Sequence, residues 1–291
     1  MSKTKAPITA KQIVDFERFH FSEQQCNQLY DMICVDDQIN LDVTLPNKIT
    51  FEYTQKQFIE SFMISRRLWL EGIVDQQFPK IIRGLCASSK ITEENKVIYK
   101  MVRAKFKHLC YAYRGFDARH KRPFLLGNIT GLLGLIQDGF KNDKSSIVIP
   151  NAILLNSLWN EQGLSFLKRE AYRYFPCDLA DFTFTLHKNV RFIQQQIQNN
   201  STLSAHEFHT LRKQMSMFSA LYGTFDVLYS SPYHHQVFQY LATINGLMGD
   251  YHDILIENKL NKTQNYFFDR FILPENISTR LAIFIKYFQP Q

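Results

Sequence analysis

Apolar side chains recur every three or four residues through most of this chain, and this spacing restricts the folds open to it. The clearest case follows Thr92, where Ile98, Val102, Phe106 and Leu109 mark a single face. A period of three to four residues is that of an α-helix with one side in a core. Thr92 is a good residue to cap its start. The pattern therefore predicts an all-α protein with a long helix over 92–116.

Similar patterns predict helices over most of the remaining sequence. Three of them begin with a capping box, a hydroxyl residue followed three positions later by Gln or Glu, at Ser22, Thr54 and Ser204. Pro150 is expected in the first turn of a helix that reaches about residue 175. Residues 35–53 are expected to be extended or loop. Further helices are expected over 178–200, 232–255 and 276–288.

The composition is that of a packed chain without a membrane span. Of 291 residues, 45% are hydrophobic, and the longest apolar stretch runs only from Phe124 to Ile136. A bilayer crossing needs about 20 residues. The amino terminus lacks the apolar segment of a signal peptide. The five cysteines contain no C-x-x-C pair, which is typical of free thiols in a reducing compartment. These features predict a cytoplasmic protein with no cofactor and no membrane partner.

The positive charge is concentrated in one segment. The net charge is 34 − 27 = +7, whereas residues 96–122 hold nine Lys or Arg and one acid, so the remaining residues sum to −1. The basic residues that share the helical period are Lys96, Lys100, Arg103, Lys107 and Arg114, and those in the following turn are Arg119, Lys121 and Arg122. Exposed helix faces usually mix the two signs. The stripe therefore predicts an anion-binding surface, with a solvated lysine face as the alternative.

The basic helix also matches the helix after Ser204. At an offset of 212 − 103 = 109, Arg103 aligns with Arg212, and Asp117 with Asp226. One residue further out of step, Gly139-x-x-x-Asp143 aligns with Gly249-x-x-x-Asp253. We expect Asp143 and Asp253, which end these motifs, each to form a hydrogen bond or ion pair with a residue of another helix rather than contact an anion. Matching segments of this kind predict an internal duplication.

With these motifs the chain resembles the CHAD family, the conserved-histidine α-helical domain. The family's His-x-x-Arg motif is followed by a Leu-Gly-x-x-x-Asp motif. The second half here reads His209-Thr210-Leu211-Arg212-Lys213 and then Leu247-Met248-Gly249-x-x-x-Asp253. The first half reads Lys100-x-x-Arg103-x-x-x-Lys107 and then Gly139-x-x-x-Asp143. The resemblance implies two related four-helix halves, residues 91–201 and 202–291, after an N-terminal helical extension of residues 1–90.

The resemblance implies non-catalytic binding of inorganic polyphosphate, or a similar polyanion, between the halves. In addition to the basic stripe, His209, Arg212 and Lys213 would contact it, and His206 and His209 could donate when protonated. The sequence departs from the family in three places. Lys100 stands where the first histidine would fall, and Ser216 and Ser219 stand where Lys or Arg is usual. A degenerate member that serves as a scaffold for protein interaction is therefore an alternative.

Two other functions remain open. His234-His235 and His252-Asp253, with Asp269, are similar to the ligands of metal-dependent phosphohydrolases, although their order in the chain fits poorly. Nucleic acid is a possible partner because aromatic residues interleave with the stripe, as in some stacking platforms. These residues are Tyr99, Phe106, Tyr111 and Tyr113.

Overall fold

The computed structural model describes residues 19–47, 49–198 and 202–288, and within them the chain is all-α, as predicted. The helices are α1 (Glu23–Cys34), α2 (Gln55–Ile73), α3 (Phe78–Ala87), α4 (Glu93–Phe116), α5 (Phe124–Lys141), α6 (Ser145–Leu158), α7 (Glu161–Ala171), α8 (Leu179–Gln198), α9 (Ala205–Leu228), α10 (Pro232–Leu260) and α11 (Glu275–Phe288). The two-residue strands β1 (Leu203–Ser204) and β2 (Arg270–Phe271) pair antiparallel.

Local capping chemistry sets most of the helix starts. Capping boxes form at Ser22, Thr54 and Ser204, with both reciprocal hydrogen bonds present in each. The Thr92 side chain accepts from the Asn95 N–H at the start of α4. These interactions satisfy backbone N–H groups that a helix start leaves without intrahelical partners. The described part of residues 35–53 is free of helix, in agreement with the prediction.

The predicted helix from Pro150 to about residue 175 is wrong. The structure has two helices there, and Pro150 lies inside α6, which begins at Ser145. The chain breaks after Leu158, and Asn160 starts α7 by accepting from the Gly163 N–H at 2.9 Å. A β-carbon at Gly163 would collide with the Leu158 carbonyl oxygen, so glycine is needed at this sharp junction. The predicted end of α8 near residue 200 lies outside the described residues.

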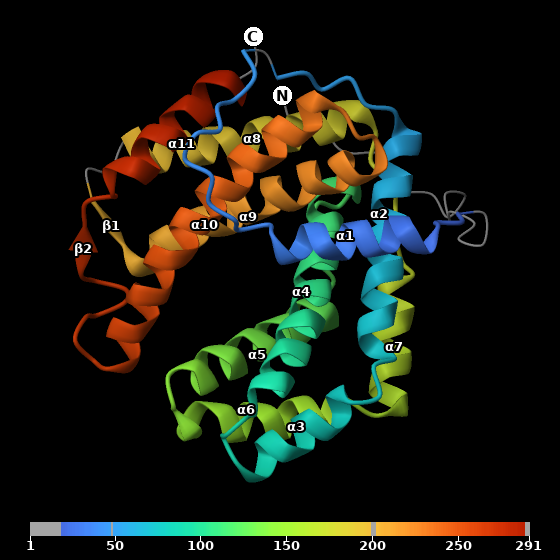
Figure 1. The fold of residues 1–291 in the computed structure, drawn as a ribbon, viewed down its shortest axis with the longest axis vertical. Coiled ribbons are helices and arrows are strands. Elements are labelled where there is room, and N and C mark those ends of the chain that lie inside the picture. The colour runs from blue at the N-terminus through green and yellow to red at the C-terminus, as the bar shows by residue number, and fades with distance from the viewer. Residues whose placement is uncertain (1–18, 48, 199–201, 289–291) are drawn as a thin grey trace, which may run out of the picture.

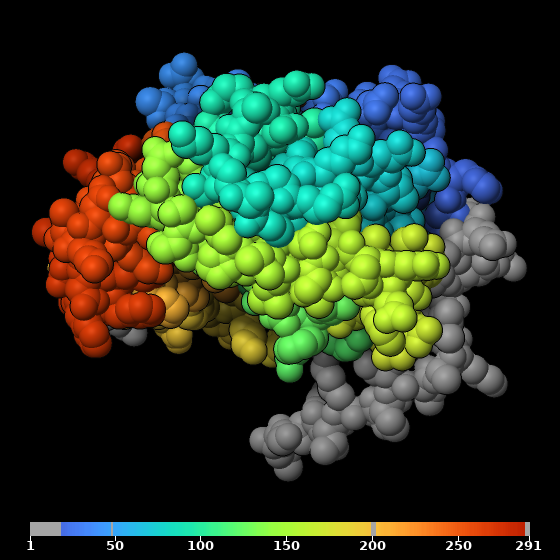
Figure 2. All heavy atoms as spheres, turned by 90° about the horizontal axis from the view of Figure 1, so that it is seen from below, coloured from blue at the N-terminus to red at the C-terminus, as the bar shows by residue number. Residues whose placement is uncertain are grey.

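The helices form two groups with the same order of packing. In the lower group of Figure 1, α3 packs on α4 and α6, and α5 packs on α4 and α6. In the upper group, α8 packs on α9 and α11, and α10 packs on α9 and α11. From below, Figure 2 shows the segments of α3 and α6 side by side on the surface of the lower group. No helix in the described part of the chain is both long and apolar enough to span a membrane.

The predicted boundaries at residues 90/91 and 201/202 separate helices that pack together. The first would divide α3 from α4 and α6, and the second would divide α8 from α9 and α11. Moreover, α2 lies along α4, and α1 lies against α9, so the described part of residues 1–90 joins both groups. Residues 1–18 of that predicted extension, together with 199–201 and 289–291, lie outside the described residues. The predicted duplication stays a prediction.

Helices α4 and α9 join the two groups through a close crossing. Gly115 on α4 faces Leu221 on α9 so closely that a β-carbon would overlap the leucine side chain. Around the crossing, a buried aromatic cluster includes Phe58 of α2, Phe182 of α8 and Phe225 of α9. This packing fixes the side of α4 that carries the basic stripe opposite the start of α9.

Candidate functional site

A cleft of about 980 Å³ lies between the two groups of helices. One wall comes from α4, α5 and the turn between them, the other from α9 and α10, and the turn after α1 closes part of it. Nine of the eleven predicted anion-binding residues line this cleft: Lys100, Arg103, Lys107, Arg114, Lys121, Arg122, His209, Arg212 and Lys213. Lys141 on α5 adds another ammonium group to the lining.

Two predicted residues, Lys96 and Arg119, lie outside the cleft. The Lys96 ammonium pairs with Glu93 at 2.7 Å on the exposed start of α4. Arg119 donates from Nε and Nη2 to the fully buried carboxylate of Asp117, both at 2.7 Å, and from Nη2 to the Arg173 carbonyl oxygen. The Arg119 guanidinium thus neutralises a buried charge. Neither Lys96 nor Arg119 belongs to the candidate site. His206, the other predicted donor, also lies outside the lining.

Two arginines cross from one helix to a glycine on the next. Arg103 of α4 reaches Gly134 of α5, where a β-carbon would lie 3.4 Å from its Nη2. Arg212 of α9 reaches Gly249 of α10, where a β-carbon would lie 3.2 Å from its Nη2. A larger residue at either position would push the guanidinium away. The two glycines thus make room for each guanidinium at the wall of the cleft.

The first-half motif predicted at Gly139-x-x-x-Asp143 does not face Arg103. Gly139 faces Val148 of α6, and Asp143 lies beyond the end of α5 with φ 53°. Opposite Arg103 stands Leu133-Gly134-x-x-x-Asp138, which has the same Leu-Gly-x-x-x-Asp form. Asp138 lines the cleft with Asp253, whereas Asp143 does not. The sequence contains both Gly-x-x-x-Asp segments, and only the packing of α4 on α5 shows which of them faces Arg103.

The cleft contains more positive groups than it can pair internally. Lys107 lies 3.6 Å from Asp36, and Lys141 lies 3.1 Å from Asp253, the pairing across helices that was expected of this aspartate. Five cationic side chains make neither a hydrogen bond nor an ion pair with the described residues: Lys100, Arg103, Lys121, Arg122 and Lys213. Unpaired cations gathered in this way on α4, α9 and the turn after α4 favour an anionic ligand.

Three of the cations crowd one part of the cleft. Arg114 donates from Nη2 to Gln214 at 2.7 Å, which places it beside Lys213. Burial lowers the pKa of Lys213, and the neighbouring charges of Arg122 and Arg114 lower it further. Burial also lowers the pKa of Arg114, with Arg122 adding to the effect. Arg122 itself packs its side chain over Gly127 of α5. Such mutual repulsion is relieved when an anion binds.

Two histidines stack in the upper wall of the cleft. The rings of His209 and His252 lie 4.5 Å apart between centroids, at 24°. Arg212 Nη1 donates to His252 Nδ1 at 3.2 Å, so the proton of this imidazole sits on Nε2, which faces the Tyr266 hydroxyl at 3.4 Å. Burial and nearby cations lower the pKa of His209 to about 2 and that of His252 to about 3. Both rings are neutral at pH 7.

A third histidine, which sequence reasoning missed, joins three helices at the wall of the cleft. His108 is 4% exposed, and its Nε2 lies 3.1 Å from Ser65 Oγ on α2 and 3.2 Å from Thr224 Oγ1 on α9. Both hydroxyls donate to carbonyl oxygens of their own helices, so the imidazole supplies the proton to both. Burial lowers the pKa of His108 to about 3. No local pattern around His108 marks this role, because both partners are distant in sequence.

The turn after α1 brings two carboxylates into the cleft. The Asp36 carbonyl oxygen accepts from Ser219 Oγ at 3.1 Å and from Asn245 Nδ2 at 2.8 Å, while Ser216 Oγ donates to Asn245 Oδ1 at 2.6 Å. Ser216 and Ser219, which stand where the family usually has Lys or Arg, thus take part in holding this turn. Asp37 approaches Gly246 so closely that a β-carbon there would collide with its carbonyl oxygen.

The other functional alternatives gain little from the structure. The described residues contain no group of three or more His, Cys, Asp or Glu that could hold a metal ion. His235 pairs with Asp226 at 3.0 Å, and His234 lies 3.3 Å from the Tyr53 hydroxyl. The four aromatic residues of the stripe are at most 9% exposed, so they offer no face for stacking: Tyr99, Phe106, Tyr111 and Tyr113.

Comparison of the chain with models of known protein families, with curated proteins and with solved structures finds no match. The resemblance to the CHAD family therefore rests on the short motifs alone. Of these, His209-x-x-Arg212 and Gly249-x-x-x-Asp253 meet at the wall of the cleft through the contact of Arg212 with Gly249.

Proposed function

We propose that the cleft binds a chain of linked phosphates, such as inorganic polyphosphate, without catalysing a reaction on it. One observation carries this proposal: five cationic side chains from α4, α9 and the turn after α4 face one cleft without a hydrogen bond or ion pair to the described residues. Like charges gathered along one cleft raise the local positive potential, and a bound polyanion would supply the opposite charges that the described residues do not.

The spacing of the cations suits a repeating anion. On α4, Lys100, Arg103 and Lys107 follow each other at intervals of three and four residues, which sets neighbouring side chains about 5–6 Å apart. Arg212 and Lys213 face them from α9. Arginine can contact two phosphate oxygens at once, and lysine acts as a point charge. A phosphate chain has no sequence to read, so charge spacing on rigid helices is a sufficient basis for recognition.

Single-stranded nucleic acid fits the cleft less well. Proteins that bind it usually stack bases on exposed aromatic rings. The aromatic side chains of the basic helix are buried in the core instead. Nucleic acid is therefore tested as a competing ligand. If no ligand binds, the scaffold for protein interaction becomes the favoured alternative.

The experiment is a binding titration with long-chain polyphosphate, orthophosphate, single-stranded DNA and RNA over a series of salt concentrations. We expect polyphosphate to bind most tightly, with log K falling by about 0.7 per neutralised phosphate for each unit of log salt, using the coefficient for single strands. Stronger binding of DNA or RNA at matched salt would contradict the proposal. If the protein binds none of these ligands, the proposal is wrong and the scaffold for protein interaction is the remaining alternative.

A charge-reversal pair locates the binding. The change Lys100→Glu with Arg103→Glu should abolish polyphosphate binding, because it converts two unpaired cations of the cleft into anions. The matched control, Lys188→Glu with Arg191→Glu, makes the same charge change on exposed positions of α8 outside the cleft lining. Circular dichroism should show unchanged helicity in both. Equal affinity in the two variants would remove the stripe from the site.

A further inference from the structure

The charge of the cleft is unevenly distributed along its length. At one end Arg114, Arg122 and Lys213 come together, and the charged groups that perturb the Lys213 ammonium are the two arginines. No carboxylate is among the groups that shift the pKa of Lys213. Lys213 is one turn along α9 from His209, so this cation cluster lies on the His209 side of the cleft.

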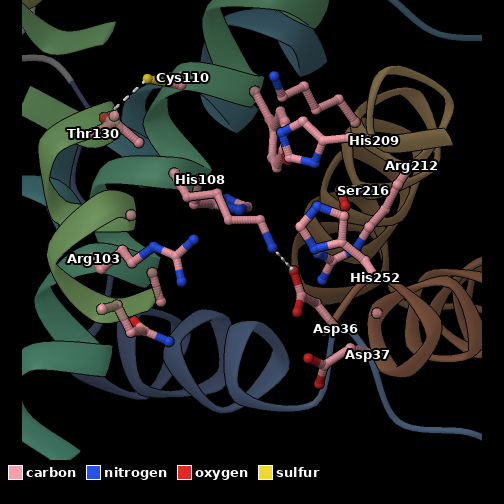
Figure 3. A pocket seen from close by; sticks show the side chains of 18 of the residues that line it. Asp36, Asp37, Arg103, His108, Cys110, Thr130, His209, Arg212, Ser216 and His252 are labelled. Carbon is pink, nitrogen blue, oxygen red and sulfur yellow. Dashed lines mark hydrogen bonds and ion pairs between the residues drawn. The ribbon is translucent and has the colours of Figure 1, made fainter. Parts of the chain in front are cut away.

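The opposite end carries acids. Asp36 and Asp37 lie side by side on the side of the cleft away from His209, as Figure 3 shows. Burial raises the pKa of the Asp36 carboxyl, and the neighbouring Asp37 raises it further. The positive charges of Lys107 and Arg212 lower it in part. Elsewhere in the lining, Asp253 pairs with Lys141, Asp138 lies near Arg103 and Arg212, and Asp250 is a further carboxylate. A phosphate chain that continued past this turn would meet like charges.

The acidic turn is fixed in place. Besides the contacts to the Asp36 carbonyl, the Asn40 N–H donates to Thr243 Oγ1 at 3.0 Å, and the same hydroxyl lies 3.1 Å from the Asn40 carbonyl oxygen. Gly246 lets the Asp37 backbone touch α10 directly. The carboxylates are therefore held on a packed turn, so a ligand cannot displace them without breaking these bonds.

We propose that the cleft binds a phosphate chain at its end. The terminal phosphate contacts Arg114, Arg122 and Lys213, the next phosphates run towards Arg103 and Arg212, and the Asp36–Asp37 turn excludes the continuing chain. This inference rests on the proposed function and adds which part of the polyanion is recognised.

The chemistry of a chain end matches this distribution. A terminal phosphate carries close to two negative charges near pH 7, as a phosphate monoester does, and an internal phosphate carries one. The densest group of cations therefore stands where the ligand has most charge. A volume of about 980 Å³ is at the upper end of the range for small-molecule sites. A short oligophosphate, or the last few phosphates of a long chain, fills such a space.

The test is the number of protein molecules bound per long polyphosphate chain, measured by light scattering at saturation. End recognition predicts one protein at each end and no more. It also predicts that linear tripolyphosphate competes, and that blocking both chain ends as phosphoramidates weakens binding at least tenfold, about 1.4 kcal/mol. Many copies per chain, with unchanged binding to blocked chains, would overturn end recognition while leaving polyphosphate binding intact. Failure of every phosphate ligand would overturn the proposed function itself.

A pair of variants tests the acidic turn separately. Asp36→Asn with Asp37→Asn keeps the shape of both side chains and removes their charge. We expect this variant to bind internal segments, so that more copies bind to each chain. Asp31→Asn with Asp42→Asn is the control, because both aspartates are exposed and lie outside the cleft lining. An unchanged number of copies for the Asp36/Asp37 variant would contradict exclusion by the turn.

Discussion

The imidazole of His209 stacks on that of His252 at 4.5 Å between ring centroids, in the wall where the basic residues of α9 meet α10. His209 Nδ1 is buried and has no hydrogen-bond partner among the described residues. Burial lowers the pKa of His209 to about 2, with further contributions from Lys213, His252 and Arg212. An anion beside this pair would reverse part of that effect, because it favours the protonated ring.

The first prediction concerns proton uptake on binding. A polyanion near His209 raises its pKa from about 2, so affinity for polyphosphate should increase as the pH falls towards the raised pKa of the complex, with protons taken up from the buffer. Calorimetry in buffers of different ionisation enthalpy measures this uptake. His209→Gln is the control, since the ligand's own titration is common to both proteins. Identical pH profiles for the two proteins would contradict the prediction.

Acid sensitivity of the fold gives a second prediction. The pKa of His108 is about 3 in the folded protein, below its ordinary value of 6.5, so the unfolded chain binds more protons between these values. Stability is therefore complete above about pH 6.5 and is lost as the pH falls, by up to about 1.4 kcal/mol per pH unit from this residue. Urea unfolding of the wild type and His108→Gln from pH 7 to pH 4 isolates its share. Parallel curves would show that His108 contributes nothing.

Substitution of two arginines that are close in sequence should change stability in one case and polyphosphate binding in the other. Arg119→Ala leaves the fully buried Asp117 carboxylate without its guanidinium partner, at a cost of about 3 kcal/mol. Arg122→Ala removes an exposed cation of the cleft and should weaken polyphosphate binding at least tenfold with a change in unfolding free energy of less than about 1 kcal/mol. Urea unfolding and binding titrations on both variants measure the two effects. Equal loss of stability would contradict the assignment of Arg119 to the fold.

Two glycines one turn apart on α10 should respond differently to alanine. At Gly246 the new methyl group would collide with the Asp37 backbone, so Gly246→Ala should lower the unfolding free energy by about 2 kcal/mol. At Gly249 it would meet only the movable end of Arg212 at 3.2 Å, and alanine favours the helix by up to about 1 kcal/mol. Gly249→Ala should therefore keep its stability and lose affinity. Thermal unfolding and a polyphosphate titration check both, and the opposite order of stabilities would refute the comparison.

Sequence by itself determined the local features. The caps at Ser22, Thr92 and Ser204 and the apolar faces that follow them predicted the helices, because capping and side-chain periodicity act within a few residues. The clustering of Lys and Arg before Pro123 is likewise a property of the chain. It marked six of the residues that line the cleft: Lys100, Arg103, Lys107, Arg114, Lys121 and Arg122.

Tertiary structure alone decided which of these residues meet. It paired Arg103 with Gly134 instead of Gly139, committed Arg119 to Asp117, and brought Asp36 from the turn after α1 to Lys107. Each of these outcomes depends on which helix faces pack together, and packing between distant segments leaves no local pattern in the chain. The number and sequence positions of the charges are properties of the chain. Their uneven distribution along the cleft follows from the packing of α1 against α9 and of α4 against α5.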